Sequence, residues 1–182
     1  MNLIMGKFTL VLGPMFSGKT TELIRRCRRM MAIGKKVIIF NHKNDNRNGI
    51  HTVSTHDGAT LKAMSIDMIT THWLNEFVKD YDVIAFDEGQ FFKGLRDAVD
   101  FLRKDMDKNV LVAGLSGDAD MNPWPVITSL IPMSDEIVHC RALCVKCHKP
   151  AAFTKKLIPG GNRIDVGGKE KYMAVCFDCY NI

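Results

Sequence analysis

One segment constrains the fold of this chain more than any other. Gly13-Pro14-Met15-Phe16-Ser17-Gly18-Lys19-Thr20 matches the pattern G-x-x-x-x-G-K-[ST] at every fixed position. It directly follows the apolar run 8–12 and opens a helical pattern over 19–33, which Gly34 closes. In that context the backbone N–H groups and the helix N-terminus form an anion site, which an ordinary glycine turn would not. The segment therefore predicts a loop that binds the phosphates of ATP, with Lys19 on the β- and γ-phosphates and the Thr20 hydroxyl on Mg²⁺.

The chain around this loop alternates between apolar runs and helical patterns. Further short apolar runs span 37–40, 83–86 and 110–113, and helical patterns span 65–79 and 94–104. Residues Ile66, Ile69, Trp73 and Phe77 would share one face of the 65–79 helix, whereas 41–60 is polar and irregular. Continuously apolar strands between helices predict an α/β fold of the P-loop NTPase kind, a parallel sheet flanked by helices on both faces.

The pattern changes near residue 140, where cysteine pairs, lysines and glycine-rich turns begin. We therefore expect a nucleotide-binding α/β domain over 1–140. The remainder, 141–182, is too short to depend on a hydrophobic core of its own. We expect it to be a small domain held together by a metal ion.

The metal ligands expected there are two cysteine pairs, Cys144-x-x-Cys147 and Cys176-x-x-Cys179. Four thiolates supply the closed tetrahedral shell of a structural Zn²⁺ site, whereas a catalytic zinc keeps one position open. Disulfide pairing and thiol redox chemistry are the alternatives, and Cys140 or His148 could replace a ligand. Cys27 lies within the first helical pattern and is expected to be a buried apolar residue.

Two carboxylates follow the apolar run 83–86. In P-loop enzymes an acid at this strand end holds Mg²⁺, and the carboxyl edge of a parallel sheet is where ligands bind. Asp87 fits the magnesium role. Glu88 would point to another face, where it could accept the proton of a substrate hydroxyl as a general base.

Composition narrows the class of protein further. The chain has 182 residues, 46% of them hydrophobic, six cysteines and a formal charge of +5. No apolar run reaches the ~20 residues of a membrane helix, and the first residues lack a signal-peptide core, so we expect a soluble intracellular protein. The arginines at 25, 26, 28 and 29 lack interleaved aromatic residues, which favours a solvated or subunit-facing surface over nucleic-acid binding.

The phosphate loop, the acidic pair and the cysteine pairs, in this order, resemble the type II thymidine kinases, the cellular and poxvirus kind. The resemblance covers almost the entire chain. The segments 13–26 and 87–92 are similar to the family's phosphate loop and acidic motif. Asp45-x-Arg47 and Thr55-His56-Asp57 match its middle loops. The segments 152–156 and 166–172 match its C-terminal loop, called a lasso, which closes over the nucleoside.

The resemblance implies that the protein transfers the γ-phosphate of ATP to the 5′-hydroxyl of thymidine, giving thymidine monophosphate for DNA synthesis. Glu88 matches the general base, Lys19 the phosphate-binding lysine, and Arg47 an arginine near the transferred phosphate. Thr20 and Asp87 match the magnesium positions, and Gln90 is assigned to the ATP site. The positions matched to the thymidine site are Met15, Asp45, Phe91, Leu115, Trp124, Val166, Gly167, Gly168 and Tyr172.

The resemblance also implies a cytoplasmic homotetramer that binds thymidine triphosphate as a feedback ligand, with neither nucleic acid nor membrane as partner. The segment Asn41-His42-Lys43 before Asp45 departs from the family pattern, and so do two single positions. Ala119 and Trp124 stand where the family usually or often has phenylalanine. The Ala119 departure keeps open a kinase for another deoxynucleoside. Two alternatives of other classes are a P-loop ATPase whose zinc module binds nucleic acid and a non-catalytic nucleotide-binding regulator.

Overall fold

The computed structural model describes residues 6–43, 52–54 and 60–182. Three sequence predictions, those for Asp45, Arg47 and Thr55-His56-Asp57, lie outside the described residues. The centre of the protein is a six-stranded sheet in the order β5-β2-β6-β7-β1-β8, and its neighbouring strands run parallel. Its strands are β1 Phe8–Gly13, β2 Val37–His42, β5 Met64–Ile66, β6 Val83–Phe86, β7 Asn109–Leu115 and β8 Glu136–His139.

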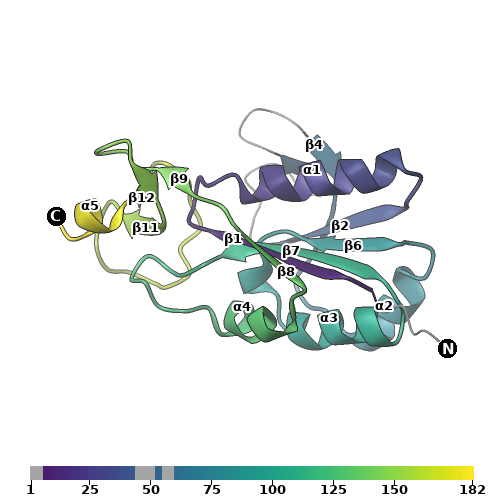
Figure 1. Ribbon diagram of the computed structural model, residues 1–182. Helices are drawn as coiled ribbons and strands as arrows, with labels where there is room; N and C mark the ends of the chain where they lie inside the picture. The colour runs from purple at the N-terminus through teal and green to yellow at the C-terminus, as the bar shows by residue number, and fades with distance from the viewer. Residues whose placement is uncertain (1–5, 44–51, 55–59) are drawn as a thin grey trace.

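Helices cover both faces of this sheet (Figure 1). They are α1 Lys19–Ala32 on one face, and α2 Thr71–Phe77, α3 Leu95–Lys104 and α4 Pro125–Leu130 on the other. Side chains alternate between the faces along each central strand, so Ile84 and Phe86 of β6 pack with α2, α3 and α4, while Val83 and Ala85 pack with α1. The predicted parallel sheet with helices on both faces is confirmed.

The predicted helix over 65–79 is wrong at its first half. Residues Met64–Ile66 form β5, which pairs with β2, and α2 begins only at Thr71. Thr70 caps that helix, since its side-chain oxygen accepts a hydrogen bond from the Trp73 N–H at 3.3 Å. Ile66 therefore belongs to an edge strand. It packs against the same core cluster as Trp73 and Phe77, whose rings lie against Phe40.

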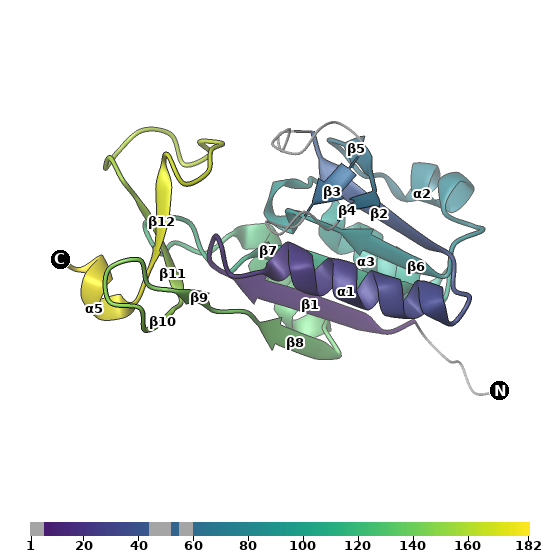
Figure 2. The same ribbon diagram turned by 90° about the horizontal axis from the view of Figure 1, so that it is seen from above.

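The parallel arrangement places the carboxyl ends of the strands at one edge of the sheet. The phosphate loop follows β1, the acidic pair follows β6, and Leu115 ends β7. The strand β8, which the sequence pattern did not indicate, ends at the same edge and leads into residues 141–182. This C-terminal segment therefore extends beyond the edge at which the site residues gather (Figure 2).

The C-terminal segment consists of short strands and one helical turn. Its elements are β9 Ala142–Leu143, β10 Pro150–Ala151, β11 Phe153–Lys156, β12 Tyr172–Val175 and α5 Phe177–Tyr180, with β9 antiparallel to β10 and β11 antiparallel to β12. Its buried side chains form a hydrophobic cluster of their own. The predicted boundary at 140 falls between β8 and β9. Four further elements belong to the first part of the chain. They are β3 Thr52–Ser54, antiparallel to β4 Thr60–Lys62, and the 3₁₀ helices η1 Gly89–Phe91 and η2 Ile131–Met133.

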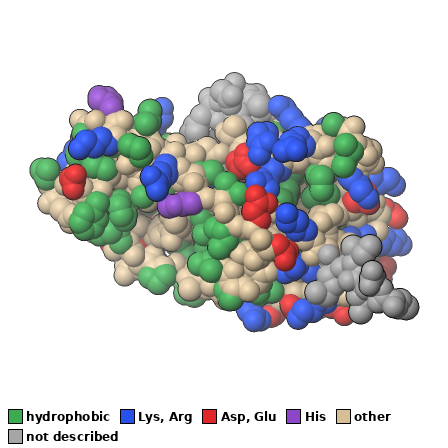
Figure 3. All heavy atoms as spheres, viewed as in Figure 1, with side chains coloured by type: hydrophobic (Ala, Val, Ile, Leu, Met, Phe, Trp, Pro, Cys, Tyr) green, Lys and Arg blue, Asp and Glu red, His purple; other side chains and the backbone are tan. Residues whose placement is uncertain are grey.

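The arginine-rich face of α1 carries charges of both signs. Figure 3 shows Lys and Arg side chains interspersed with Asp and Glu over this helix. Arg26 donates to both carboxylate oxygens of Glu136 on β8, at 2.7 and 2.8 Å, and to Glu22 at 2.7 Å. Hydrogen bonds from Arg25 and Arg26 lower the pKa of Glu22 to about 2. This network ties α1 to the edge strand β8.

Within the described residues, no helix combines the length and the apolar character that crossing a membrane requires.

The pKa of Glu22 predicts a pH-dependent contribution to stability. Its folded pKa of about 2 lies below its ordinary value of 4.5, so the carboxylate stabilises the fold above pH ~4.5 and loses that effect as the pH falls toward 2. We expect Glu22→Gln to lower the free energy of unfolding by about 1–2 kcal/mol at pH 7. Urea unfolding at pH 7, 5 and 3.5 should show the difference from wild type shrinking with pH. A difference that stays constant would contradict the prediction, and Asp100→Asn, at an exposed pair with Lys104, is the control.

Candidate active site

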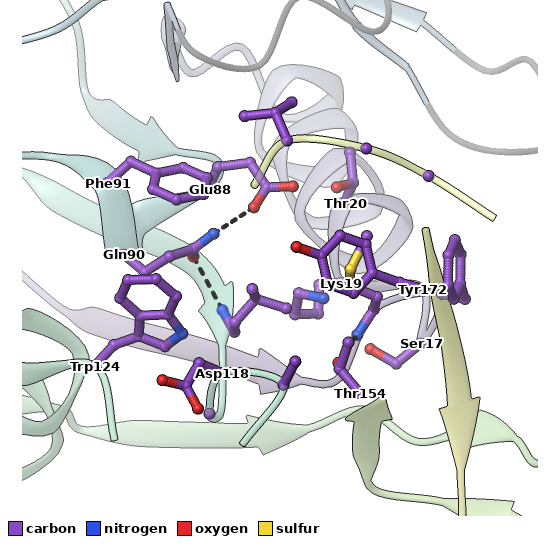
Figure 4. A pocket seen from close by; sticks show the side chains of 18 of the residues that line it. Ser17, Lys19, Thr20, Glu88, Gln90, Phe91, Asp118, Trp124, Thr154 and Tyr172 are labelled. Atoms are coloured by element: carbon purple, nitrogen blue, oxygen red, sulfur yellow. Dashed lines mark hydrogen bonds between the residues drawn. The ribbon is translucent and has the colours of Figure 1, made fainter. Parts of the chain in front are cut away.

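A cavity of about 430 Å³ lies at the carboxyl edge of the sheet. It is lined by residues within 15–21, 87–91, 115–124 and 163–172, together with Thr154. Figure 4 shows Lys19 and Thr20 with the phosphate loop, Glu88 and Gln90 across from them, and Phe91, Trp124 and Tyr172 around the remaining space. One cavity therefore joins the predicted phosphate site to the predicted nucleoside site.

The phosphate loop has the backbone that its sequence requires. Gly18 has φ 79°, a left-handed conformation natural for glycine, and Phe16 adopts φ 64° against the usual preference. The Phe16 side chain packs against the hydrophobic cluster of the C-terminal segment. Lys19, which is buried, donates to the Pro14 carbonyl at 2.7 Å, and the Ser17 hydroxyl donates to the same carbonyl at 2.8 Å. The lysine is thus held over the loop whose N–H groups form the anion site.

Thr20 and Asp87 meet across the sheet edge. The Thr20 hydroxyl donates to the two carboxylate oxygens of Asp87, at 3.0 and 3.2 Å. Asp87 is buried, and its N–H donates to the Phe40 carbonyl at 2.8 Å, which fixes the start of the acidic turn. A hydroxyl and a carboxylate are oxygen ligands of the kind that Mg²⁺ prefers, so the pair fits the predicted magnesium role.

Gln90 connects Glu88 to the end of β7. Its side-chain amide donates to the Glu88 carboxylate at 2.6 Å and accepts a hydrogen bond from the Leu115 N–H at 3.0 Å (Figure 4). Glu88 itself has φ 56°, an unusual conformation for a glutamate. The sequence assigned Gln90 to the ATP site, and the structure places it beside Glu88, Phe91 and Trp124.

The other half of the cavity has mostly apolar walls. The rings of Phe91 and Trp124 meet edge to face, with centroids 5.9 Å apart, and Met15 and Leu115 also line this part. The Tyr172 hydroxyl donates at 2.6 Å to the carbonyl of Asp165, in the loop 157–171 between β11 and β12, which we call the lasso loop. Val166, Gly167 and Gly168 of this loop, which the family resemblance assigns to the thymidine site, line the cavity. A flat base fits walls of this kind.

Three cavity residues that make long-range polar contacts were not among the predicted site residues. The Thr154 hydroxyl accepts a hydrogen bond from the Met15 N–H at 2.9 Å, which joins β11 to the phosphate loop. Asp118 and Arg163 form an ion pair at 2.8 Å from opposite sides of the cavity. A threonine in a strand pattern and an arginine in a glycine-rich loop carry no signal of these long-range contacts.

The four predicted cysteine ligands lie together. The sulfur atoms of Cys144, Cys147, Cys176 and Cys179 lie within 4.8 Å of one another, and the Sγ atoms of Cys147 and Cys176 are 3.5 Å apart. Tetrahedral coordination with ~2.3 Å bonds places sulfur atoms about 3.8 Å apart, so the four thiols fit a Zn²⁺ ion. Burial raises the pKa of the Cys144 thiol, but backbone N–H groups of Cys176, Cys147 and Lys146 outweigh that effect and lower it to about 6.

The other cysteines have different surroundings. All six cysteines are free thiols, and neither Cys140 nor His148 belongs to the cluster. Cys140 lies against Gly13 of the phosphate loop. Cys27, on the inward face of α1, is fully buried in the core as predicted, and burial raises the pKa of its thiol to about 12.

The phosphate loop after β1, the acid after β6 and the helix-flanked parallel sheet define a P-loop nucleotide-binding protein with room for a second, flat ligand beside the phosphates. Comparison with known proteins specifies the class further. The family model described as "Thymidine kinase" matches residues 6–180. The chain belongs to the thymidine kinase family.

Individual relatives agree along nearly the whole length. The chain is 40% identical to the thymidine kinase of Raccoon poxvirus over 177 residues, covering 96% of this chain and 97% of that protein. It is 37% identical to the thymidine kinase of Pseudothermotoga lettingae over 179 residues, covering 97% and 95%. It is 39% identical to that of Vaccinia virus (strain Western Reserve) over 177 residues, covering 96% and 97%.

The position of the acidic turn predicts the effect of a small substitution. A Cβ at Gly89 would lie 2.6 Å from Val112 Cγ1 and 3.2 Å from the Ala113 carbonyl oxygen. We expect Gly89→Ala to lower the free energy of unfolding by about 1–3 kcal/mol through overpacking, and to weaken ligand binding by displacing Glu88 and Gln90. Thermal unfolding measures the first effect, with Gly117→Ala as control because its Cβ would meet only ordinary contacts. Unchanged stability of Gly89→Ala would contradict this packing.

Proposed function

We propose that this protein is an ATP-dependent thymidine kinase, which transfers the γ-phosphate of ATP to the 5′-hydroxyl of thymidine and gives thymidine monophosphate for DNA synthesis. One observation carries the proposal. A single cavity joins the phosphate loop to a flat apolar space, with Glu88 at the junction, in a chain that belongs to the thymidine kinase family.

On the nucleotide side, the N–H groups of 13–20 and the ammonium group of Lys19 neutralise charge on the phosphates. Thr20 and Asp87 would hold Mg²⁺, which supplies further charge neutralisation when it is bound. Arg47, outside the described residues, is proposed to act near the transferred phosphate, as in the resemblance. Because little covalent chemistry is needed, positioning and charge stabilisation supply most of the rate enhancement.

On the nucleoside side, Glu88 takes the proton of the 5′-hydroxyl as that oxygen attacks the γ-phosphorus in line with the leaving oxygen. Gln90 keeps the Glu88 carboxylate in place, and this positioning role replaces its assignment to ATP in our proposal. Phe91, Leu115, Trp124 and Tyr172 enclose the base and sugar, with Met15 and the loop residues 166–168. Asp45 is also proposed for this site.

The four-cysteine cluster is proposed to hold a structural Zn²⁺ that stabilises 141–182 as a small domain, separate from the α/β domain over 1–140. The support is the sulfur geometry and the closed ligand shell. The family resemblance supports three further proposals: a cytoplasmic location, a homotetramer, and feedback binding of thymidine triphosphate. One cavity joining base pocket and phosphate loop would accommodate such a ligand.

The test of the function is transfer of radiolabelled γ-phosphate from ATP to thymidine, deoxyuridine, deoxycytidine and purine nucleosides, with and without DNA. We expect thymidine to be phosphorylated with one ATP consumed per product, and DNA to have no effect. Preference for another deoxynucleoside would trace to the pocket around Ala119 and Trp124. ATP consumption that depends on DNA and yields no nucleoside monophosphate would refute the proposal.

Glu88 is tested by Glu88→Gln, which keeps size and hydrogen-bonding capacity but cannot accept the proton. We expect kcat to fall about 10²–10⁴-fold, the usual contribution of general base catalysis, while binding of ATP and thymidine is largely kept. Steady-state kinetics and calorimetric binding measure the two effects. Near-normal turnover would remove Glu88 from this role. Glu76→Gln, at an exposed position on α2, is the matched control.

Metal removal tests the role of the cysteines. We expect one zinc per chain by elemental analysis, and we expect chelation or Cys179→Ser to increase hydrogen exchange over 141–182 and to weaken thymidine binding. Cys140→Ser should retain the zinc, because Cys140 lies outside the cluster. If the protein loses its zinc while hydrogen exchange over 141–182 and thymidine affinity stay unchanged, the proposed structural role of the zinc is contradicted.

A further inference from the structure

The lasso loop, residues 157–171, reaches the opposite wall of the cavity through one side chain. Arg163 pairs through Nε with the Asp118 carboxylate at 2.8 Å, and its Nη2 donates to the Pro123 carbonyl at 2.6 Å. Its guanidinium carbon also lies 4.4 Å from the centroid of the Trp124 ring. Three contacts of different kinds thus converge on 118–124, the segment that follows β7.

The Asp118 carboxylate lies in surroundings that favour an ion pair with Arg163. Its side chain is only 4% exposed. One carboxylate oxygen accepts the N–H groups of Asp120 and Asn122, at 3.0 and 2.8 Å, and the other accepts Arg163. A buried carboxylate needs a partner for its charge, and truncating one member of such a pair leaves the other unpaired. The arginine therefore neutralises the group that shapes the turn before Trp124.

Trp124 connects Arg163 to the base pocket, the part of the cavity lined by Phe91, Leu115 and Trp124. Its ring is buried, with the Phe91 ring edge to face against it and the Arg163 guanidinium over it. Its Nε1 is the one buried side-chain polar atom among the described residues that has no hydrogen-bond partner. A planar guanidinium can stack on an indole and pair with a carboxylate at once, which a lysine ammonium cannot do equally well.

The rest of the lasso loop holds its own shape. Lys156 donates to the carbonyls of Gly160 and Asn162, and Lys171 pairs with Asp165. The Tyr172 hydroxyl donates to the Asp165 carbonyl. These contacts lie within the loop or at its base. Loss of the Arg163 side chain would thus leave the loop formed but weaken its attachment to the wall.

We propose that Arg163 is a positioning residue that latches the lasso loop to Asp118 and Trp124, so that the loop and the indole are preorganised for the nucleoside. The latch acts on nucleoside affinity rather than on phosphoryl transfer, because Arg163 contacts the wall of the base pocket and not Glu88 or the phosphate loop. This inference rests on the proposed thymidine kinase function.

The experiment compares wild type, Arg163→Ala, Arg163→Lys and Asp118→Asn, with Arg96→Ala on the exposed face of α3 as the control for loss of an arginine. For Arg163→Ala we expect thymidine KM to rise roughly tenfold, with kcat and the KM for ATP within about threefold of wild type, since ordering of the loop must then accompany binding. Arg163→Lys should recover part of the affinity. Asp118→Asn should behave like Arg163→Ala, and Arg96→Ala like wild type.

Two measurements without substrate separate the latch from the function. Hydrogen exchange over 157–171 should be faster in Arg163→Ala than in wild type, with exchange over 142–156 unchanged. In a Trp73→Phe background Trp124 is the remaining tryptophan, and its fluorescence should change on Arg163→Ala.

Unchanged exchange, fluorescence and thymidine KM in Arg163→Ala would overturn the latch. A fall in kcat together with an equal rise in the KM for ATP would also overturn the latch, since both changes would indicate a general effect on the site. If wild type phosphorylates no thymidine, the proposed function fails, and the exchange and fluorescence results still decide whether the latch exists.

Discussion

The hydrogen bond from Thr20 to Asp87 joins two parts of the chain that the sheet alone does not bring into contact. The strands that precede Thr20 and Asp87 in the chain are β1 and β6, and β7 lies between these two strands in the sheet. The bond therefore spans the edge at which three consecutive strands end, and it holds the start of α1 next to the acidic turn. Lys19, Glu88 and Gln90 each lie within three residues of one of its partners, so this contact helps to bring them together.

The second part of the site depends on how the chain leaves the sheet. β8 is parallel to β1, so its end brings 141–182 to the edge where the phosphate loop lies. The contacts that attach this segment to the site include those of Thr154 with the Met15 N–H, Tyr180 with the Ala119 carbonyl, and Arg163 with Asp118. Hydrophobic side chains also gather on this end of the molecule in the view of Figure 3. The cavity is therefore a product of two regions, each incomplete without the other.

What the sequence could predict was set by local patterns. The apolar runs at β1, β6 and β7 and the phosphate-loop motif are each recognisable within a few residues, and the structure confirms the fold they imply.

Thr70 shows the limit of such patterns. Apolar spacing extended the helix back to Ser65, whereas the capping threonine and the pairing of β5 with β2 set its real start. β8 was missed because an edge strand with alternating exposure lacks a continuous apolar run. The bonds between Gln90 and Leu115, Thr154 and Met15, and Arg163 and Pro123 join positions 25 or more residues apart, so no local pattern could indicate them.

In the proposed reaction, ATP and thymidine occupy one cavity and the phosphate passes directly between them. The stereochemical course at phosphorus tests it most directly. With ATP made chiral at the γ-phosphorus by oxygen isotopes and sulfur, the product thymidine thiophosphate should show inverted configuration, because a single in-line transfer inverts the phosphorus. Retention would require two transfers through a phosphorylated enzyme and would contradict this account of the site.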